Sequence, residues 1–446
     1  MPTQRPKHLF TAILAAALLG AAWSSGLETI ELDGYRASFD PNQAFTITEG
    51  DLDCTPYGSP STIRATETHG RLGEADYLIY QPADWNGDLV LFAHDEASPY
   101  NVNGAFWFSL PLGFDPQVAD MRFVQARDAA LCHGFAWAAS ASERYGAAPE
   151  YLMRSTHLLG ALAPRHLATD PARTFVTGHW FGGLPVIALA ESYPHRYAGA
   201  IIGPAPTGGT RMFIDEVMHV AALFDVVFPD LVEHERERGM LPDEVEEFVG
   251  ALMARLEADP TALMRMATIH MPGSERYDPD GVGHPVLWPD PSLEDGFMAL
   301  AAELFTYVVG YLVGIEDMRT QGGGALPFDN QHVVYRGEDW SPEDLADLNA
   351  RVPRHTADPL AVRHWTFYYE PSGALQIPLV SIRTPWGQYP EHAWTYADRV
   401  TRSGASEMYS VWHIPTFLVG ETYAAALRAL VDWVETGVRP TWPTAP

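Results

Sequence analysis

The stretch TFVTGHWFGG, Thr174 to Gly183, has the form of a turn that presents one side chain for chemistry. A short β-type run enters a Gly-x-x-x-Gly turn, and an apolar helical segment follows it. A serine in the middle of such a turn would be a nucleophile once a neighbouring base took its proton. The middle residue here is Trp180, and an indole is not a nucleophile near neutral pH. No acyl-enzyme can therefore form at this position.

Polar residues that follow two other β-rich runs are the remaining candidates for chemistry. His94, Asp95 and Glu96 come directly after GDLVLFA, and His413 ends the run SVWH. They contain the residue types of a 2-His-carboxylate metal set, but their spacing matches no recognised metal motif. The segment Asp278–Gly281, DPDG, lacks the twelve-residue pattern of a calcium loop. We therefore expect no metal site, and we treat Asp95 as a speculative catalytic carboxylate.

The elements that must position these residues alternate between strand and helix. Strand-like runs occur at residues 76–82, 87–93, 134–142, 174–177 and 197–206, and helical patterns occur at 123–131, 150–167 and after Gly183. This alternation predicts an α/β fold with a mostly parallel central sheet and helices on both faces.

Between about residues 207 and 370 the pattern changes. Charged helical sequence replaces the β-rich runs, and strand-like sequence returns at IPLVSIRT, residues 377–384. We interpret this stretch as a helical insertion over one end of the sheet. The predicted organisation is a signal peptide at 1–25, the first part of the core at 26–206, a large helical cap insertion at 207–370 and the second part of the core at 371–446.

The composition indicates a folded, acidic protein. Hydrophobic residues make up 47% of the 446 positions, which is enough for a sizeable core. Asp and Glu total 57 against 28 Lys and Arg, which gives a formal net charge of −29. Such a surface repels phosphate backbones, so the sequence argues against nucleic-acid binding. The charge is explained either by a solvated acidic surface or by recognition of a cationic partner.

The N-terminus has the features of an export signal. Arg5, Lys7 and His8 precede roughly 15 apolar residues and then small residues, as in a signal peptide. A retained membrane anchor is the alternative, but no later segment approaches the roughly 18 apolar residues of a membrane span. We therefore predict a secreted or periplasmic protein that does not contact the membrane after signal removal. Cys54 and Cys132 either form one disulfide in such a compartment or remain two buried thiols.

Five motifs, in order along the chain, resemble those of the α/β-hydrolase superfamily, in particular a secreted bacterial branch of serine esterases and peptidases. They are PADWNGDLVLFAH, TGHWFGG, GALPFDN, IPLVSIRT and WVETGVRP, and the match runs from about Tyr77 to Pro440. The resemblance implies an α/β-hydrolase fold that hydrolyses esters or peptides with a Ser-Asp-His triad and needs no cofactor. Function must still be argued from the site, because one fold carries many activities.

The nucleophile and the acid that the resemblance implies are both altered. Trp180 stands at the nucleophile position, although Gly178 and Gly182 of the turn are retained. In the loop after IPLVSIRT, where the triad Asp is expected, Trp386 stands nearest and no Asp is present. Glu391, the closest carboxylate in that loop, more readily opens the following helix.

The triad histidine and the oxyanion turn are altered as well. The resemblance places the histidine at His413, where Trp412 replaces the usual preceding glycine. A lone histidine there is also explained as a hydrogen-bonded packing residue. The third strand of the family ends in His-Gly, but here it is followed by His94, Asp95 and Glu96. Carboxylates beside an intended oxyanion would destabilise it unless they are protonated or turned away.

Three tryptophans, Trp180, Trp386 and Trp412, thus occupy positions that the resemblance places around one cleft. They either fill the former catalytic pocket or line a binding site for a small apolar or aromatic ligand, and unorthodox catalysis is the third interpretation. The binding-site interpretation also includes the following residues at the turn and the strand end: His94, His179, Phe181 and Gly182.

The leading functional hypothesis is a secreted α/β-hydrolase homologue with a degenerate triad, inactive as a serine hydrolase, that binds a small ligand or a protein partner. The alternative is an active ester or peptide hydrolase that uses a displaced nucleophile, Asp95 or a water activated by a histidine. Ser140 and Ser142 are the nearest alternative hydroxyls, although neither lies on an elbow-like turn. A third explanation is that Trp180 was introduced and is not the natural residue.

Overall fold

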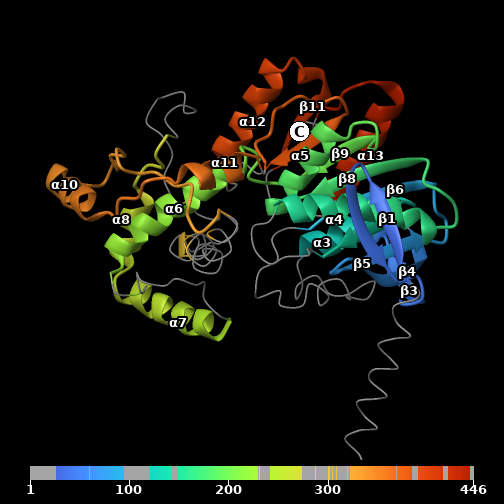
Figure 1. The fold of residues 1–446 in the computed structure, drawn as a ribbon, viewed down its shortest axis with the longest axis horizontal. Coiled ribbons are helices and arrows are strands. Elements are labelled where there is room, and N and C mark those ends of the chain that lie inside the picture. The colour runs from blue at the N-terminus through green and yellow to red at the C-terminus, as the bar shows by residue number, and fades with distance from the viewer. Residues whose placement is uncertain are drawn as a thin grey trace, which may run out of the picture.

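The structure is a computed structural model, and it describes residues 27–59, 61–94, 121–141, 149–229, 231, 242–273, 287, 300–301, 304, 308, 319, 322–367, 369–383, 390–414 and 420–441. Within these residues the chain forms an eleven-stranded sheet, helices on both faces of that sheet, and a further group of helices that extends to one side (Figure 1).

The sheet is antiparallel at its N-terminal edge and parallel elsewhere. Its strands are β1 (Glu28–Leu32), β2 (Tyr35–Phe39), β3 (Phe45–Asp53), β4 (Thr62–Leu72), β5 (Ala75–Pro82), β6 (Asp88–Ala93), β7 (Ala136–Ser140), β8 (Arg173–Gly178), β9 (Gly199–Ile202), β10 (Leu379–Arg383) and β11 (Tyr409–His413). Their spatial order is β1-β2-β4-β5-β7-β6-β8-β9-β10-β11, and β3 pairs with β4. All pairings from β7 to β11 are parallel, whereas β5 runs antiparallel to β7.

Alternating side chains divide the core between the two faces of the sheet. Along β6, Val90 and Phe92 pack with helices α3 (Met121–Cys132) and α13 (Gly420–Thr436). Leu89 and Leu91 point the other way and pack with α4 (Pro149–Leu162) and α5 (Gly183–Ser192). This two-residue period is what a strand buried on both faces requires. The predicted mostly parallel sheet with helices on both faces, the α/β-hydrolase fold class, is confirmed.

The described residues between β9 and β10 form helices and loops and add no strand to the main sheet. These helices are α6 (Thr210–Val227), α7 (Pro242–Ala258), α8 (Pro260–Ala267), α10 (Pro342–Arg351) and α11 (Pro359–Phe367). The first four share a hydrophobic cluster that includes Leu223, Leu252 and Leu263, and α11 packs on α6 in a second cluster. We call this group the helical segment; the predicted domain boundaries at 207 and 370 stay a prediction.

Two helices of the helical segment begin where the sequence supplies a cap. The Asp259 side chain accepts a hydrogen bond from the Ala262 N–H at 3.2 Å, and Pro260 is the first helical residue of α8. Ser341 caps α10 in the same way through the N–H of Asp344, and Pro342 follows it. A capping oxygen satisfies an N–H that lacks an intrahelical partner, and proline has no N–H to lose at that position.

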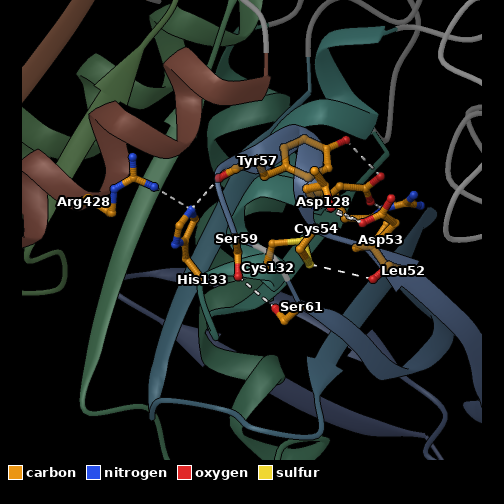
Figure 2. Close-up of a disulfide and its surroundings, with 12 residues drawn as sticks. Leu52, Asp53, Cys54, Tyr57, Ser59, Ser61, Asp128, Cys132, His133 and Arg428 are labelled. Carbon is orange, nitrogen blue, oxygen red and sulfur yellow. Dashed lines mark hydrogen bonds and ion pairs between the residues drawn. A yellow bond between two sulfur atoms is a disulfide. The ribbon is translucent and has the colours of Figure 1, made fainter.

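The two cysteines are bonded to each other. Cys54 and Cys132 form a disulfide with a Cα–Cα distance of 5.4 Å, so the alternative of two free thiols is wrong. Figure 2 shows the bond between the start of the short helix η2 (Thr55–Tyr57) and the last turn of α3. Nearby, the Tyr57 hydroxyl donates to Asp128 Oδ2 at 3.3 Å, which adds a second connection between the same two elements.

Among the residues that the structure describes, no helix is long and apolar enough to cross a membrane. The predicted signal peptide at 1–25 lies outside the described residues.

Candidate functional site

The strand–turn–helix at TFVTGHWFGG keeps the backbone of a nucleophile elbow. Strand β8 ends at Gly178, the turn contains the short helix η5 (Trp180–Gly182), and α5 begins at Gly183. Trp180 has a φ of 51°, and in the described part of the chain Asp33 is the only other non-glycine residue with a positive φ. A bulky residue in this region is strained by roughly 1–3 kcal/mol. The Trp180 N–H, which donates to the Pro204 carbonyl at 2.7 Å, helps to hold the turn.

Two glycines make the turn possible by letting backbones approach each other. A Cβ at Gly178 would lie 2.5 Å from the Gly182 carbonyl oxygen, and a Cβ at Gly182 would lie 2.4 Å from the Ala93 carbonyl oxygen. Any other residue at either position forces the backbone to shift. The turn is therefore packed against the end of β6, as an elbow that presents its middle residue must be.

The side chains of the elbow contact the helical segment. Trp180 is half-buried and packs against the hydrophobic cluster of that segment. Phe181 is 3% exposed, and its ring centroid lies 5.4 Å from that of Phe213 on α6. The position that carries a nucleophile in a serine hydrolase thus holds an apolar contact between the sheet and the helices.

His413 lies at the end of β11, where the sequence predicted the triad histidine, and it is exposed. Its register partner on the neighbouring strand is Arg383. Partial burial, and after it the positive charge of Arg383, lower the pKa of His413 below its usual range. A triad carboxylate would act in the opposite direction, because it stabilises the imidazolium. In its electrostatic surroundings, His413 therefore differs from the base of a Ser-Asp-His triad.

Trp412 is 2% exposed and belongs to the core cluster on the face of the sheet covered by α3 and α13. Trp180 packs against a different cluster, that of the helical segment. Adjacent residues of β11 face opposite sides of the sheet, and the exposed one of the two is His413. That Trp180, Trp386 and Trp412 fill or line one pocket stays a prediction.

Two other predicted site residues, His94 and His179, are buried beside the elbow. His94 follows β6 and is 7% exposed; His179 precedes Trp180 and is 3% exposed. The His179 ring meets Phe92 edge to face, with centroids 5.4 Å apart. Both lie next to the turn as expected, and their role in ligand binding stays a prediction.

Several predicted residues cannot be placed. Asp95, Trp386 and Ser142 lie outside the described residues. Ser140 is the last residue of β7 and is 2% exposed, so it does not lie on an exposed turn. In the described ranges, no group of three His, Cys, Asp or Glu side chains is placed to hold a metal ion.

The structure adds a buried polar cluster that the sequence analysis missed. His392 on α12 (Pro390–Arg402) is fully buried, and its Nδ1 accepts a hydrogen bond from the Gly208 N–H at 2.9 Å. Its Nε2 lies 3.0 Å from Oε1 of Glu216 on α6. Glu391, in the first turn of α12 as expected, is 5% exposed. Nothing in the sequence connects residues this far apart, so only the fold reveals the cluster.

A surface pocket of about 270 Å³ lies within the helical segment, away from the elbow. Its wall includes Arg265, Trp340 and Asp344. Arg265 stacks over the Trp340 ring at 4.1 Å and forms an ion pair with Asp344 at 3.1 Å. Because the charged groups on this wall are already paired, the pocket differs in character from the apolar elbow.

Neither the protein-family models nor the curated proteins contain a match to this chain. Among solved structures the chain is similar to an esterase from Aspergillus oryzae, with 14% identity, coverage of 92% of this chain and 88% of the other, and a TM-score of 0.42. It is also similar to closed-state lipase A of Candida antarctica, with 12% identity, coverage of 92% and 86%, and a TM-score of 0.42. A third is the tannin acyl hydrolase of Aspergillus niger, with 11% identity, coverage of 91% and 84%, and a TM-score of 0.44.

The parallel strands, the strained turn after β8 and the helices on both faces form an α/β-hydrolase fold. The middle residue of that turn is Trp180.

Proposed function

We propose that the protein is an exported α/β-hydrolase homologue that has lost serine-hydrolase chemistry and acts by binding a small apolar or aromatic ligand. The observation that carries this proposal is Trp180 in the strained elbow position, with its side chain against the helical segment. Binding of a protein partner at the same apolar surface is the other form of the hypothesis.

The loss of chemistry follows from what each position can do. An indole at the elbow supplies no nucleophile, and losing the nucleophile of a triad costs on the order of 10⁶ in turnover. His413 has a guanidinium as its register partner, so its imidazolium is not stabilised in the way that a general base requires. The backbone of the elbow persists because Gly178 and Gly182 still pack closely, and that packing does not depend on catalysis.

The disulfide supports export. Cys54 and Cys132 are bonded in the fold, and such bonds persist mainly in oxidising compartments outside the cytosol. The basic and apolar N-terminal sequence has the features of an export signal, and the net charge of −29 suits a solvated surface. The resemblance to a secreted bacterial branch of serine esterases and peptidases agrees with both.

The proposed ligand is apolar because the described residues of the elbow present aromatic rings. Trp180, Phe181 and Phe213 place aromatic surface between the sheet and α6. Aromatic rings bind flat apolar groups through burial and edge or face contacts. The paired charges of the pocket in the helical segment make that pocket a poorer match for such a ligand.

Hydrolysis of a short-chain chromogenic ester by the purified mature protein is the test, with a fluorophosphonate probe for reactive serine. We expect no turnover above buffer and no labelled serine, both in the wild type and in Trp180→Ser, because the base lacks a carboxylate neighbour in the described structure. Turnover that disappears in His413→Ala would overturn the proposal and favour the active-hydrolase alternative. Binding is tested with neutral N-phenyl-1-naphthylamine, whose fluorescence should rise with the wild type and rise less with Trp180→Ala.

A further inference from the structure

The two chain connections between the helical segment and the sheet both contact one helix, α12. The chain enters the segment through residues 207–216, and Thr207 Oγ1 donates to the His392 carbonyl at 3.0 Å. It returns near residue 370, where Arg399 of α12 donates to the carbonyl of Pro371 at 3.0 Å. The same guanidinium donates to the Gly208 carbonyl at 2.9 Å. Both connections of the helical segment therefore meet at α12, and we call this junction the hinge.

Buried ionisable groups concentrate at that hinge. Nδ1 of His392 accepts the Gly208 N–H, and Nε2 on the other side of the ring faces Glu216. Among the described residues Oε2 of Glu216 has no hydrogen-bond partner, and the side chain is only 7% exposed. Glu391 is buried next to His392 in the chain. We call Glu216, Glu391 and His392, with the Gly208 N–H, the carboxyl latch.

Other charges act on the groups at the latch and beside it. Glu370 and Arg399 act on His392, and Glu216 acts on Glu391. Arg211, Glu370 and Asp329 act on Asp215, the neighbour of Glu216 on α6. Arg399 pairs with Glu370 at 3.1 Å. Among the described residues, neither Glu216 nor Glu391 forms an ion pair with an arginine or a lysine.

Burial of a carboxyl group without a cation favours its neutral form. Burial raises the pKa of Glu216 well above its ordinary value. Burial, and then the nearby Glu216, raise the pKa of Glu391 to about 7. Burial raises the pKa of the half-buried Asp215 to about 7 as well. Burial lowers the pKa of His392 to about 4, so its ring is neutral over the range in which the carboxyl groups titrate.

We infer that the carboxyl latch is a pH-dependent hinge lock, which holds the helical segment on the sheet in mildly acidic surroundings and releases it as the pH rises. Ionisation puts negative charges on neighbouring buried groups of α6 and α12, and opening of the hinge lets water solvate them. This inference concerns the hinge and does not depend on whether the elbow catalyses a reaction.

The direction follows from proton linkage. A carboxyl whose pKa is raised in the closed state stabilises that state fully below its ordinary pKa, and the stabilisation is lost as the pH rises toward about 7. His392 acts oppositely, because its lowered pKa makes the closed state more favourable as the pH rises from about 4. Two or more carboxyl groups outweigh one histidine, so opening increases with pH. Between about pH 5.5 and about pH 8 the net change in the opening equilibrium is on the order of 10–100-fold.

Hydrogen exchange of the mature protein at about pH 5.5 and about pH 8 tests the latch. The readout is the protection factor, which divides out the pH dependence of intrinsic exchange. We expect the Gly208 amide to lose on the order of 10–100-fold in protection at the higher pH, while amides of β6 and β8 do not change. Equal protection of Gly208 at both pH values would overturn the inference.

Variants distinguish a pH effect of the latch from a general loss of stability. Glu216→Gln and Glu391→Gln keep the shape of each side chain but cannot ionise, so each should reduce the pH dependence at Gly208, and together they should reduce it further. Asp344→Asn in the exposed ion pair of α10 is the matched control and should leave it unchanged. If the double variant does not fold, either single variant suffices. An unaltered pH dependence in a folded single variant would sink the proposal.

Discussion

The elbow and the carboxyl latch contact opposite ends of one short loop, residues 203–209, and they differ in the kind of side chain that they hold. At the elbow end, Pro204 accepts the Trp180 N–H, and the turn keeps a strained backbone around an apolar side chain. At the latch end, Gly208 donates to His392 beside buried ionisable side chains. The comparison shows that the elbow depends on close packing of its backbone, whereas the latch contains buried groups whose charge changes with pH.

A substitution that disturbs the backbone of the elbow should have the largest effect on the free energy of unfolding. A Cβ at Gly182 would lie 2.4 Å from the Ala93 carbonyl oxygen and 2.7 Å from that of His94. Gly182→Ala should therefore lower the free energy of unfolding by about 3 kcal/mol or more, as measured by urea unfolding. Gly250→Ala in α7 is the matched control, since no atom lies within 4 Å of its added Cβ, and it should stabilise by about 0.5–1 kcal/mol. Similar small effects at both positions would contradict the packing argument.

Replacing the side chain at the centre of the elbow should destabilise the protein less than disturbing the backbone of the turn. Trp180→Ala removes a half-buried indole from the contact with the helical segment, and it should cost about 2 kcal/mol of unfolding free energy. Thermal unfolding followed by circular dichroism gives this value. Trp394→Ala on α12, where 37% of the residue is exposed, should cost clearly less. A loss no larger than that of Trp394→Ala would show that Trp180 does not join the two regions.

The latch should show a smaller effect that depends on pH. Glu216 is buried and its pKa is raised, so the wild type loses stability as the pH rises above the ordinary range of a carboxyl group. Glu216→Gln should therefore raise the unfolding free energy by about 1–2 kcal/mol at about pH 8 relative to its effect at about pH 5.5. Urea unfolding at the two pH values measures this difference. A constant effect at both would mean that Glu216 does not change protonation with folding.

The remnant histidine should have the smallest effect. His413 is exposed at the end of β11, so His413→Ala should change the unfolding free energy by less than about 0.5 kcal/mol. It should also leave ester hydrolysis at the buffer level, measured with the same chromogenic substrate as the wild type. A measurable turnover that the substitution removes would show that the elbow region still has a working base.

The sequence predicted the strands and the tight turn of the core because patterns over a few residues determine them. Hydrophobic alternation in GDLVLFA and the glycines of TGHWFGG determine a buried strand and a tight turn over a few residues, and both are where they were expected. The exposure of His413 and the burial of Trp412 also follow from strand alternation.

Contacts between residues far apart in the sequence depend on the fold, and local sequence patterns do not show them. The pairing of Cys54 with Cys132 requires a Cα–Cα distance of 5.4 Å, which arises only when α3 packs beside the N-terminal strands. Glu216 and His392 meet because both connections of the helical segment reach α12. No periodicity or motif in the sequence carries that information.

The loop 203–209 also makes Trp180 a built-in optical reporter. Its N–H is tied to Pro204, its indole touches the helical segment, and the far end of the same loop is tied to His392. The loop thus connects the proposed latch at one end with a fluorophore at the other. The emission spectrum of the wild type minus that of Trp180→Phe isolates this one indole, and a shift of its wavelength with pH would report opening of the hinge without any attached label.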